Sequence, residues 1–159
     1  MIGLGANLGD RLGQLRAAVR AMGKIGKIER LSRVYETEPV GPPQPAYLNA
    51  AALLVYEGGP EDLLDALLGI ERMLGRERRE KWGPRTIDLD VLWIEGMAVE
   101  TDRLAVPHPQ LTLRGFALRP LADVAPAAID PVSGNAYGNL PAAADPGVHP
   151  TTLDLSGPS

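Results

Sequence analysis

Helix-like and strand-like segments follow one another along this chain in an order that few folds accommodate. Residues 2–4, 28–36, 47–56 and 86–94 have the alternating or β-branched character of strands, whereas the segments after Asp10 and Pro60 carry apolar residues at helical spacing. The order strand, helix, strand, strand, helix, strand is that of the split βαβ, or ferredoxin-like, fold. It predicts an α/β (α+β) domain in which an antiparallel sheet has helices packed on it.

Local signals define the ends of the two main helices. Asp10 is a suitable N-cap for the first, which we expect to end near Gly23. Pro60 fits the first turn of the second helix, which we expect to end at Gly75. Residues 115–124 predict a further short helix, and the proline-rich residues 38–45 predict an ordered loop.

The length and composition favour one compact domain. A chain of 159 residues with 45% hydrophobic residues can build a single core, which we assign to residues 1–139. From Leu140 onward alanine, proline, threonine and aspartate show little periodicity, so residues 140–159 predict a loosely ordered C-terminal tail.

No run approaches the roughly 20 apolar residues that cross a bilayer, and no signal-peptide pattern opens the chain. We therefore expect a cytoplasmic monomer without a membrane partner.

The charge distribution favours a compact anionic partner. A net charge of -4 argues against general binding to nucleic acid, which requires a basic surface. Residues 71–85 nevertheless hold six basic and three acidic side chains. Because the chain has no cysteine, a bound metal would have oxygen or imidazole ligands, which makes Mg²⁺ the leading candidate.

Asp88 and Asp90 form the sharpest local signal for chemistry. Two residues apart in a strand, their side chains lie on one face with Cβ atoms roughly 7 Å apart. Such a pair can hold two hard cations and leave coordination positions open for phosphate oxygens. An isolated Asp-x-Asp also fits the solvated face of a sheet, but Trp82 and Arg85 stand just upstream and favour the metal site.

Arginines cluster ahead of the acid pair, at Arg76, Arg78 and Arg85. A guanidinium binds phosphate oxygens in a bidentate way, and the transfer of a polyphosphate group depends mostly on positioning and charge neutralisation. The same arginines also fit a solvated helix end paired with Glu77 and Glu80.

Two aromatic residues suit a flat heterocyclic ligand, and one histidine lies in a proline-ordered loop. Tyr47 stands two residues before Asn49, and Phe116 stands two residues after Arg114, so stacking faces accompany polar groups. His108 lies between two prolines that would fix the direction of its imidazole. Taken singly, each aromatic residue also fits an ordinary core position, and a loop histidine is often structural.

Residues 81–90 closely resemble the signature of the 6-hydroxymethyl-7,8-dihydropterin pyrophosphokinase family, with the sequence Lys81-Trp82-Gly83-Pro84-Arg85-Thr86-Ile87-Asp88-Leu89-Asp90. Three further segments are similar to the family in the same order: residues 3–10, residues 47–50, and residues 106–108 together with 114–116. The resemblance spans about residues 2 to 125, and it implies the same ferredoxin-like fold.

The resemblance implies that a pterin hydroxyl attacks the β-phosphorus of ATP and that AMP leaves, a step of folate biosynthesis. ATP would be the co-substrate, and two Mg²⁺ ions held by Asp88 and Asp90 would be the cofactor. The remaining residues follow from the motif match: catalytic Arg76 and Arg85; ATP-binding Glu71, Arg78, Trp82, Arg103, His108 and Arg114; and pterin-binding Thr37, Val40, Tyr47, Asn49 and Phe116.

Some positions depart from the family pattern. Ala6 stands where the family usually has serine, Lys81 replaces a common arginine, and Ala105 replaces a hydroxyl residue. Ala6 and Ala105 each remove a possible hydrogen bond, and Lys81 keeps its charge but loses the planar fork of arginine. The lengths of the loops leave the choice between Arg76 and Arg78 open, and the sequence identifies no general base.

Three other functions remain open at this level. A ferredoxin-like sheet also serves in nucleotide-sensing regulatory modules, although these have no need for two metal-holding carboxylates. An RNA-binding module would need exposed aromatic residues and a basic surface. A kinase or pyrophosphokinase for another small heterocycle would differ in the alcohol that accepts the transferred group.

Overall fold

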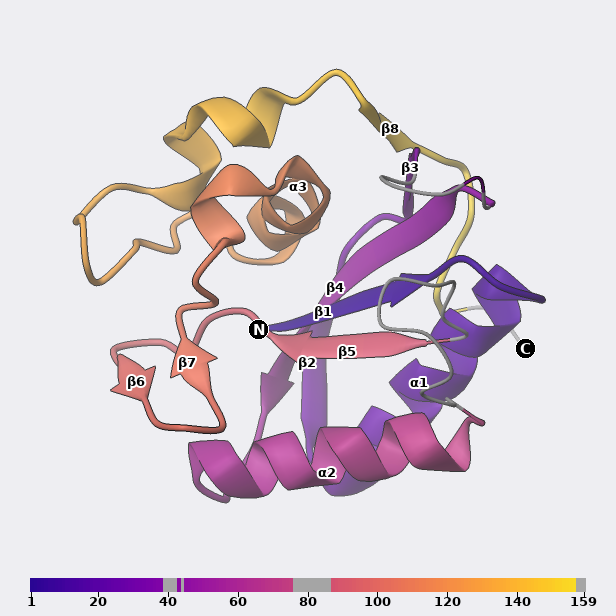
Figure 1. Ribbon diagram of the computed structural model, residues 1–159, viewed down its shortest axis with the longest axis horizontal. Helices are drawn as coiled ribbons and strands as arrows, with labels where there is room; N and C mark the ends of the chain where they lie inside the picture. Colours follow the sequence, from indigo (N-terminus) through magenta and orange to yellow (C-terminus); the bar gives the residue numbers. More distant parts are fainter. Residues whose placement is uncertain (39–42, 44, 76–86, 157–159) are drawn as a thin grey trace.

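One antiparallel sheet organises the molecule (Figure 1). The structure is a computed structural model that describes residues 1–38, 43, 45–75 and 87–156. The helices and strands are β1 (Ile2–Ala6), α1 (Arg11–Ile25), β2 (Lys27–Leu31), β3 (Tyr35–Thr37), β4 (Tyr47–Val55), α2 (Pro60–Met73), β5 (Asp88–Val91), β6 (Val99–Glu100), β7 (Ala105–Val106), α3 (Gly115–Val124) and β8 (Val148–Pro150). Short 3-10 turns occur at Leu111–Leu113, Tyr137–Asn139 and Pro141–Ala144.

The strand order confirms the predicted fold class. The sheet runs β5-β1-β4-β3-β8, and β2 pairs with β4 beside β3. The strand expected over residues 28–36 is therefore two strands, because the chain leaves the ladder at Ser32. The Ser32 hydroxyl accepts a hydrogen bond from the Ala51 N–H at 2.8 Å, so a side chain replaces part of the ladder. With β2 and β3 taken as one unit, the order is that of the ferredoxin-like sheet.

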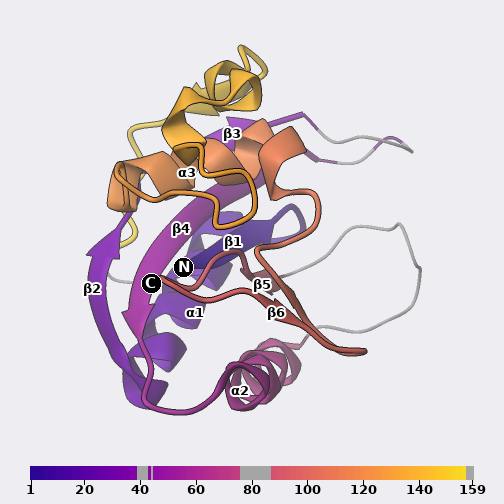
Figure 2. The same cartoon turned by 90° about the vertical axis from the view of Figure 1, so that its left-hand side faces the viewer.

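Alternating side chains give each face of the sheet its own core. On one face Leu4, Leu48 and Leu89 pack with α1 and α2. On the other, Ala51 and Leu92 pack with α3. Figure 2 shows the sheet between these helical layers. The acid pair lies on the α3 face, because Asp88 and Asp90 alternate with Leu89.

The helix ends largely follow the local signals. The Asp10 carboxylate accepts a hydrogen bond from the Gly13 N–H at 3.0 Å and caps α1. The helix does not end near Gly23 as predicted. Its backbone stays helical through Ile25, and Gly26 is the first residue with extended backbone. Pro60 opens α2 as expected, and α3 has the predicted bounds.

The strand that carries the acid pair is shorter than the predicted 86–94. It covers Asp88–Val91, and residue 86 lies outside the described part of the chain. Leu92 and Trp93 both enter the cluster on the α3 side, so the alternation stops after Val91. Ile94 then forms an isolated bridge with Met97.

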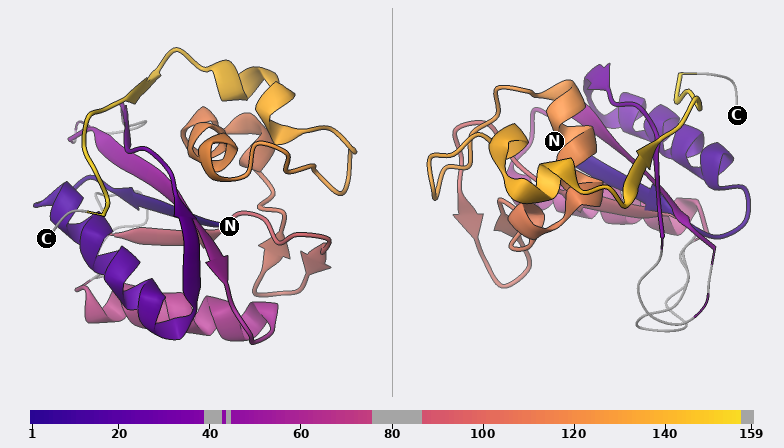
Figure 3. Two further views of the ribbon diagram at one scale, coloured as in Figure 1. Left: turned by 180° about the vertical axis from the view of Figure 1, so that it is seen from behind. Right: turned by 90° about the horizontal axis from the view of Figure 1, so that it is seen from above.

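The C-terminal residues differ from the predicted loose tail. Residues 148–150 form β8 on the outer side of β3, and Leu155 is only 3% exposed in the core beneath α1 and α2. Figure 3 shows this segment passing along the edge of the sheet. The backbone pairing of β8 and the burial of Val148 and Leu155 need no regular hydrophobic pattern, which is why periodicity did not reveal them.

Among the described residues, no helix is both long and apolar enough to cross a membrane.

Candidate active site

A row of directly opposed residues crosses three strands and joins two of the predicted site regions. Asp88 of β5 lies opposite Gly5 of β1, which lies opposite Asn49 of β4. Directly opposed residues in an antiparallel sheet share a face. The predicted metal-binding carboxylate and the predicted pterin-binding amide are therefore separated on this face by one glycine.

Gly5 of β1 keeps the surface between Asp88 and Asn49 free of a side chain. Gly3 lies opposite Asp90 in the same way that Gly5 lies opposite Asp88. A Cβ atom added at Gly5 would lie 3.1 Å from the Asn49 Oδ1 atom. A side chain at Gly5 would occupy the space in which a ligand could contact both acid and amide. At Gly3 the Leu92 side chain already covers the strand, and its Cδ1 atom would lie 2.9 Å from an added Cβ atom.

Three predicted pterin-binding residues are neighbours on β3 and β4. Thr37 lies opposite Tyr47, and the Asn49 side-chain amide donates a hydrogen bond to the Thr37 hydroxyl at 2.9 Å. Asn49 is only 6% exposed, and Tyr47 is half-buried. The bond fixes the rotation of the Asn49 amide, so its carbonyl and amide edges have a defined direction.

Glu71 has a structural contact that the sequence did not suggest. It is 2% exposed on α2, and its Oε2 atom accepts a hydrogen bond from the Leu89 N–H at 2.8 Å. Leu89 lies between the two aspartates, so α2 holds the strand that carries them. The predicted contact of Glu71 with ATP stays a prediction.

His108 lies beside the end of β5 with a fixed orientation. Its backbone N–H donates to the Leu92 carbonyl at 2.9 Å, and its Nδ1 atom accepts from the Gln110 N–H at 3.2 Å. Burial lowers the pKa of His108, the nearby Arg114 lowers it further, and Asp88 acts in the opposite direction. The imidazole is therefore neutral at pH 7 and presents its Nε2–H as a donor.

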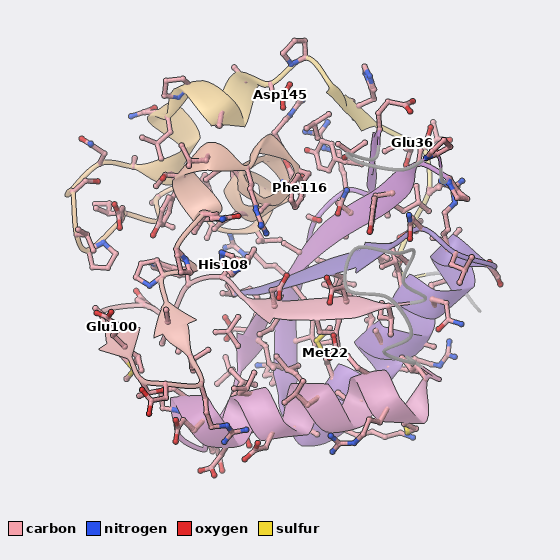
Figure 4. All side chains as sticks on the ribbon, viewed as in Figure 1. Met22, Glu36, Glu100, His108, Phe116 and Asp145 are labelled. Carbon is pink, nitrogen blue, oxygen red and sulfur yellow. The ribbon has the colours of Figure 1, made fainter. Side chains whose placement is uncertain are left out.

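Arg114 and Phe116 form a pair at the start of α3. The guanidinium carbon lies 5.5 Å from the centroid of the phenyl ring, and the guanidinium also donates to the Gln110 side chain. Phe116 is 36% exposed, which leaves part of its ring open to a ligand. Figure 4 shows Phe116 on α3 and His108 in the segment that leads to it.

Arg103 contacts α2 in this structure. It lies between β6 and β7 and forms an ion pair with Asp65, and both side chains are largely exposed. This hydrogen bond raises the pKa of Arg103 and lowers the pKa of Asp65. Its predicted contact with ATP stays a prediction.

Five predicted site residues lie outside the described part of the chain: Val40, Arg76, Arg78, Trp82 and Arg85. Lys81 is outside it as well, so the choice between Arg76 and Arg78 also stays open.

A clamp on the chain entering β4 was missed at the level of sequence. Arg11 donates to the Ala46 carbonyl at 2.8 Å and pairs with Glu36 at 3.2 Å. The buried Asn7 side chain donates to the Pro45 carbonyl at 3.3 Å. Asn7 belongs to the glycine-rich segment of residues 3–10, which was the available signal. The clamp fixes the backbone immediately before Tyr47.

The acid pair suits a hard cation that shares its ligands with a substrate. Asp88 and Asp90 are half-buried carboxylates on one face of a strand. Within the described residues, no group of three or more His, Cys, Asp or Glu side chains could enclose a metal ion. Other ligands would then come from water or phosphate oxygens, as is usual for Mg²⁺. Fold and site together define an α+β domain with two half-buried carboxylates on the same sheet face as Asn49.

Comparison with known proteins identifies the family. A family model described as 7,8-dihydro-6-hydroxymethylpterin-pyrophosphokinase (HPPK) matches residues 1–126. The chain belongs to this family. The chain is 43% identical over 136 residues to the 2-amino-4-hydroxy-6-hydroxymethyldihydropteridine pyrophosphokinase of Synechocystis, covering 84% of this chain and 70% of that protein. It is 42% identical over 126 residues to the Bacillus subtilis protein of the same name, covering 77% of this chain and 75% of that protein.

A plant relative has a longer chain. The mitochondrial folate synthesis bifunctional protein of Arabidopsis thaliana is 42% identical over 132 residues, which cover 82% of this chain but 24% of that protein. This chain therefore corresponds to about a quarter of the bifunctional protein.

Proposed function

We propose that this chain transfers the β,γ-pyrophosphoryl group of ATP to the hydroxymethyl group of 6-hydroxymethyl-7,8-dihydropterin, giving AMP and the pterin pyrophosphate for folate synthesis. Membership of the family and the names of its relatives support this reaction. The observation that carries it for this chain is the cross-strand row in which Asp88 and Asn49 flank Gly5. One ligand pair can therefore reach the carboxylates with its phosphates and the amide with its heterocycle.

The reaction forms one oxygen–phosphorus bond and breaks another. The substrate hydroxyl oxygen bonds to the β-phosphorus, the bond from the β-phosphorus to the oxygen bridging it to the α-phosphorus breaks, and AMP leaves with that oxygen. The hydroxyl proton is released. Because the transferred group keeps its phosphates, the protein must mainly align the two substrates and neutralise negative charge.

Asp88 and Asp90 are the residues that would hold Mg²⁺, and we propose two ions there. Bound Mg²⁺ supplies charge neutralisation and a template for the triphosphate. The chain contributes the rigidity of the site: β1 pairs with both aspartates, and Glu71 bonds the backbone between them.

The pterin would lie over β3 and β4. Tyr47 and Phe116 would supply stacking faces, and Asn49, oriented by Thr37, would bind the amide-like edge of the ring. A neutral His108 would donate its Nε2–H to a phosphate oxygen without adding a proton that titrates near pH 7. We also expect ATP contacts from Arg114, Arg103 and the arginines of residues 76–85.

The test is a measurement of nucleotide products with ATP, Mg²⁺ and 6-hydroxymethyl-7,8-dihydropterin. The wild-type protein should release AMP only when the pterin is present. Asp88→Asn and Asp90→Asn should each lower turnover at least about 100-fold, since metal stabilisation of several kcal/mol is lost and 1.36 kcal/mol is a factor of ten. Glu95→Gln, an exposed carboxylate outside the site, is the matched control and should behave as wild type.

Other products would identify the alternatives. ADP in place of AMP would mean transfer of the γ-phosphoryl group alone. ATP binding without turnover, measured by calorimetry on the folded protein, would favour a nucleotide-sensing module.

A further inference from the structure

The C-terminal strap, defined here as residues 141–155, lies outside the residues that match the family model. It begins with the turn Pro141–Ala144 against α3 and continues through β8 at the edge of the sheet. It ends beside α1 on the opposite face, where two nitrogens of Arg16 donate to the Asp154 carbonyl at 2.9 and 2.6 Å. Figure 3 shows its course from one helical layer to the other.

The first part of the strap packs directly on the start of α3. A Cβ atom added at Gly115 would lie 2.6 Å from the Ala142 carbonyl oxygen and 2.6 Å from the Asp145 Cβ atom. Only glycine permits this approach. Gly115 immediately precedes Phe116, and Figure 4 shows Asp145 and Phe116 in the same region of the molecule.

The second part of the strap completes β3. Thr37 lies opposite Val148, which is 1% exposed, and Glu36 lies opposite His149. Beyond this ladder both the N–H and the hydroxyl of Thr151 donate to the Val34 carbonyl, at 2.9 and 2.8 Å. Each of the three residues of β3 pairs with β4 on one side and with β8 on the other, so β8 is one of only two neighbours that hold this short strand in the sheet.

One residue of β8 also bonds to α3. The Arg119 guanidinium donates to the Val148 carbonyl at 2.8 Å. Val148 therefore contacts the strand that carries Thr37 and the helix that carries Phe116. The buried Leu155 anchors the far end of the strap in the other core.

We propose that the C-terminal strap is a positioning element for the pterin pocket, which sets the placement of Thr37 relative to Phe116. This inference rests on the proposed function, which assigns both residues to that pocket. The contacts described for the strap join it to β3, α3 and α1. The acid pair is held separately, by β1 and by Glu71. Gly115, which follows Arg114, also contacts the strap, so the selective test acts on β8 and β3 alone. Loosening their pairing should weaken pterin binding while ATP binding is retained.

A single exposed position allows the ladder to be broken selectively. Ladder bonds in an antiparallel pair fall on alternate residues. Thr151 donates to Val34, and Pro150 has no N–H, so the next bonded pair is His149 with Glu36. Because the His149 side chain is exposed, His149→Pro removes a backbone donor, and His149→Ala is the matched control that keeps it.

The Michaelis constants for the two substrates are then measured separately for wild type, His149→Pro and His149→Ala. His149→Pro should raise KM for 6-hydroxymethyl-7,8-dihydropterin about five- to tenfold, as expected from the loss of about one hydrogen bond. KM for ATP should stay within about twofold of wild type, and His149→Ala should change neither constant. Circular dichroism establishes that each variant is folded.

The outcomes separate this inference from the proposed function. If the wild-type protein makes no AMP from the pterin, both the proposed function and the positioning role of the strap are refuted. If the wild type is active, the positioning role alone is refuted when His149→Pro leaves KM for the pterin unchanged or raises KM for both substrates equally. If His149→Pro does not fold, Arg119→Met, which removes the bond to Val148 but keeps an apolar stem, must show the same split between the constants.

Discussion

Tyr35 connects the sheet to α3 through one short hydrogen bond, and removing that bond should have a measurable cost. The ring is 1% exposed, and its hydroxyl donates to the Asp123 Oδ2 atom at 2.7 Å. Tyr35→Phe removes only the hydroxyl. The ring keeps its packing and the guanidinium carbons of Arg33 and Arg119 at 5.4 and 5.2 Å from its centroid.

The size of the effect follows from the partners that remain. A hydrogen bond to a charged group contributes about 1.5–3 kcal/mol. Asp123 keeps three hydrogen bonds from Arg33, from the backbone N–H and two guanidinium nitrogens, so its carboxylate stays paired. We therefore expect a loss at the lower end, about 1.5 kcal/mol in the free energy of unfolding. For a chain of this size the melting temperature should fall by roughly 3–6 °C.

The pH dependence gives an independent check. Burial, followed by the hydrogen bond to Asp123, raises the pKa of Tyr35 from 10.0 to about 12. A raised folded-state pKa means that the stabilisation is complete below pH 10 and is lost as pH rises toward 12. The difference between wild type and Tyr35→Phe should be largest below pH 10 and narrow above it.

Urea denaturation of both proteins across this pH range measures the difference. The urea midpoint should move while the slope of the transition stays the same. A loss below about 0.5 kcal/mol at neutral pH would refute the assignment of a net favourable bond. A difference that stays constant above pH 10 would show that Tyr35 ionises as freely in the folded protein as in the unfolded one.

Further stability predictions concern one helix cap, one core position and one buried acid. Asp10→Ala removes the cap of α1 and should cost about 1 kcal/mol in urea denaturation, whereas Asp10→Asn should recover most of it. Leu67→Ala opens a cavity at a residue that is 1% exposed and should cost about 2–5 kcal/mol, and a smaller loss would mean that α2 relaxes into the space. Burial alone would raise the pKa of Asp130, but hydrogen bonds from Ser133, Val132 and Tyr137 outweigh it and lower the pKa below 3.8. Stability from Asp130 should therefore be present above pH 3.8 and fall in more acidic solution, and Asp130→Asn should make acid unfolding less steep.

The sequence by itself determined the features that depend on neighbouring residues. Caps, proline at a helix start and helical spacing act within about one turn, so the bounds of α3 and the starts of α1 and α2 could be predicted. The shared face of Asp88 and Asp90 follows from strand geometry alone. The motif around them identified the family, which the comparison confirmed.

Only the tertiary structure decided which distant segments meet. The row from Asp88 through Gly5 to Asn49 depends on the register of three strands, and register is fixed by how both faces of the sheet fill their cores. The same packing buries Glu71 against Leu89 and adds β8 to the edge of β3. Every residue except proline has the same backbone N–H, so the sequence does not indicate which acceptor that group will bond. These pairings are therefore seen only in the tertiary structure.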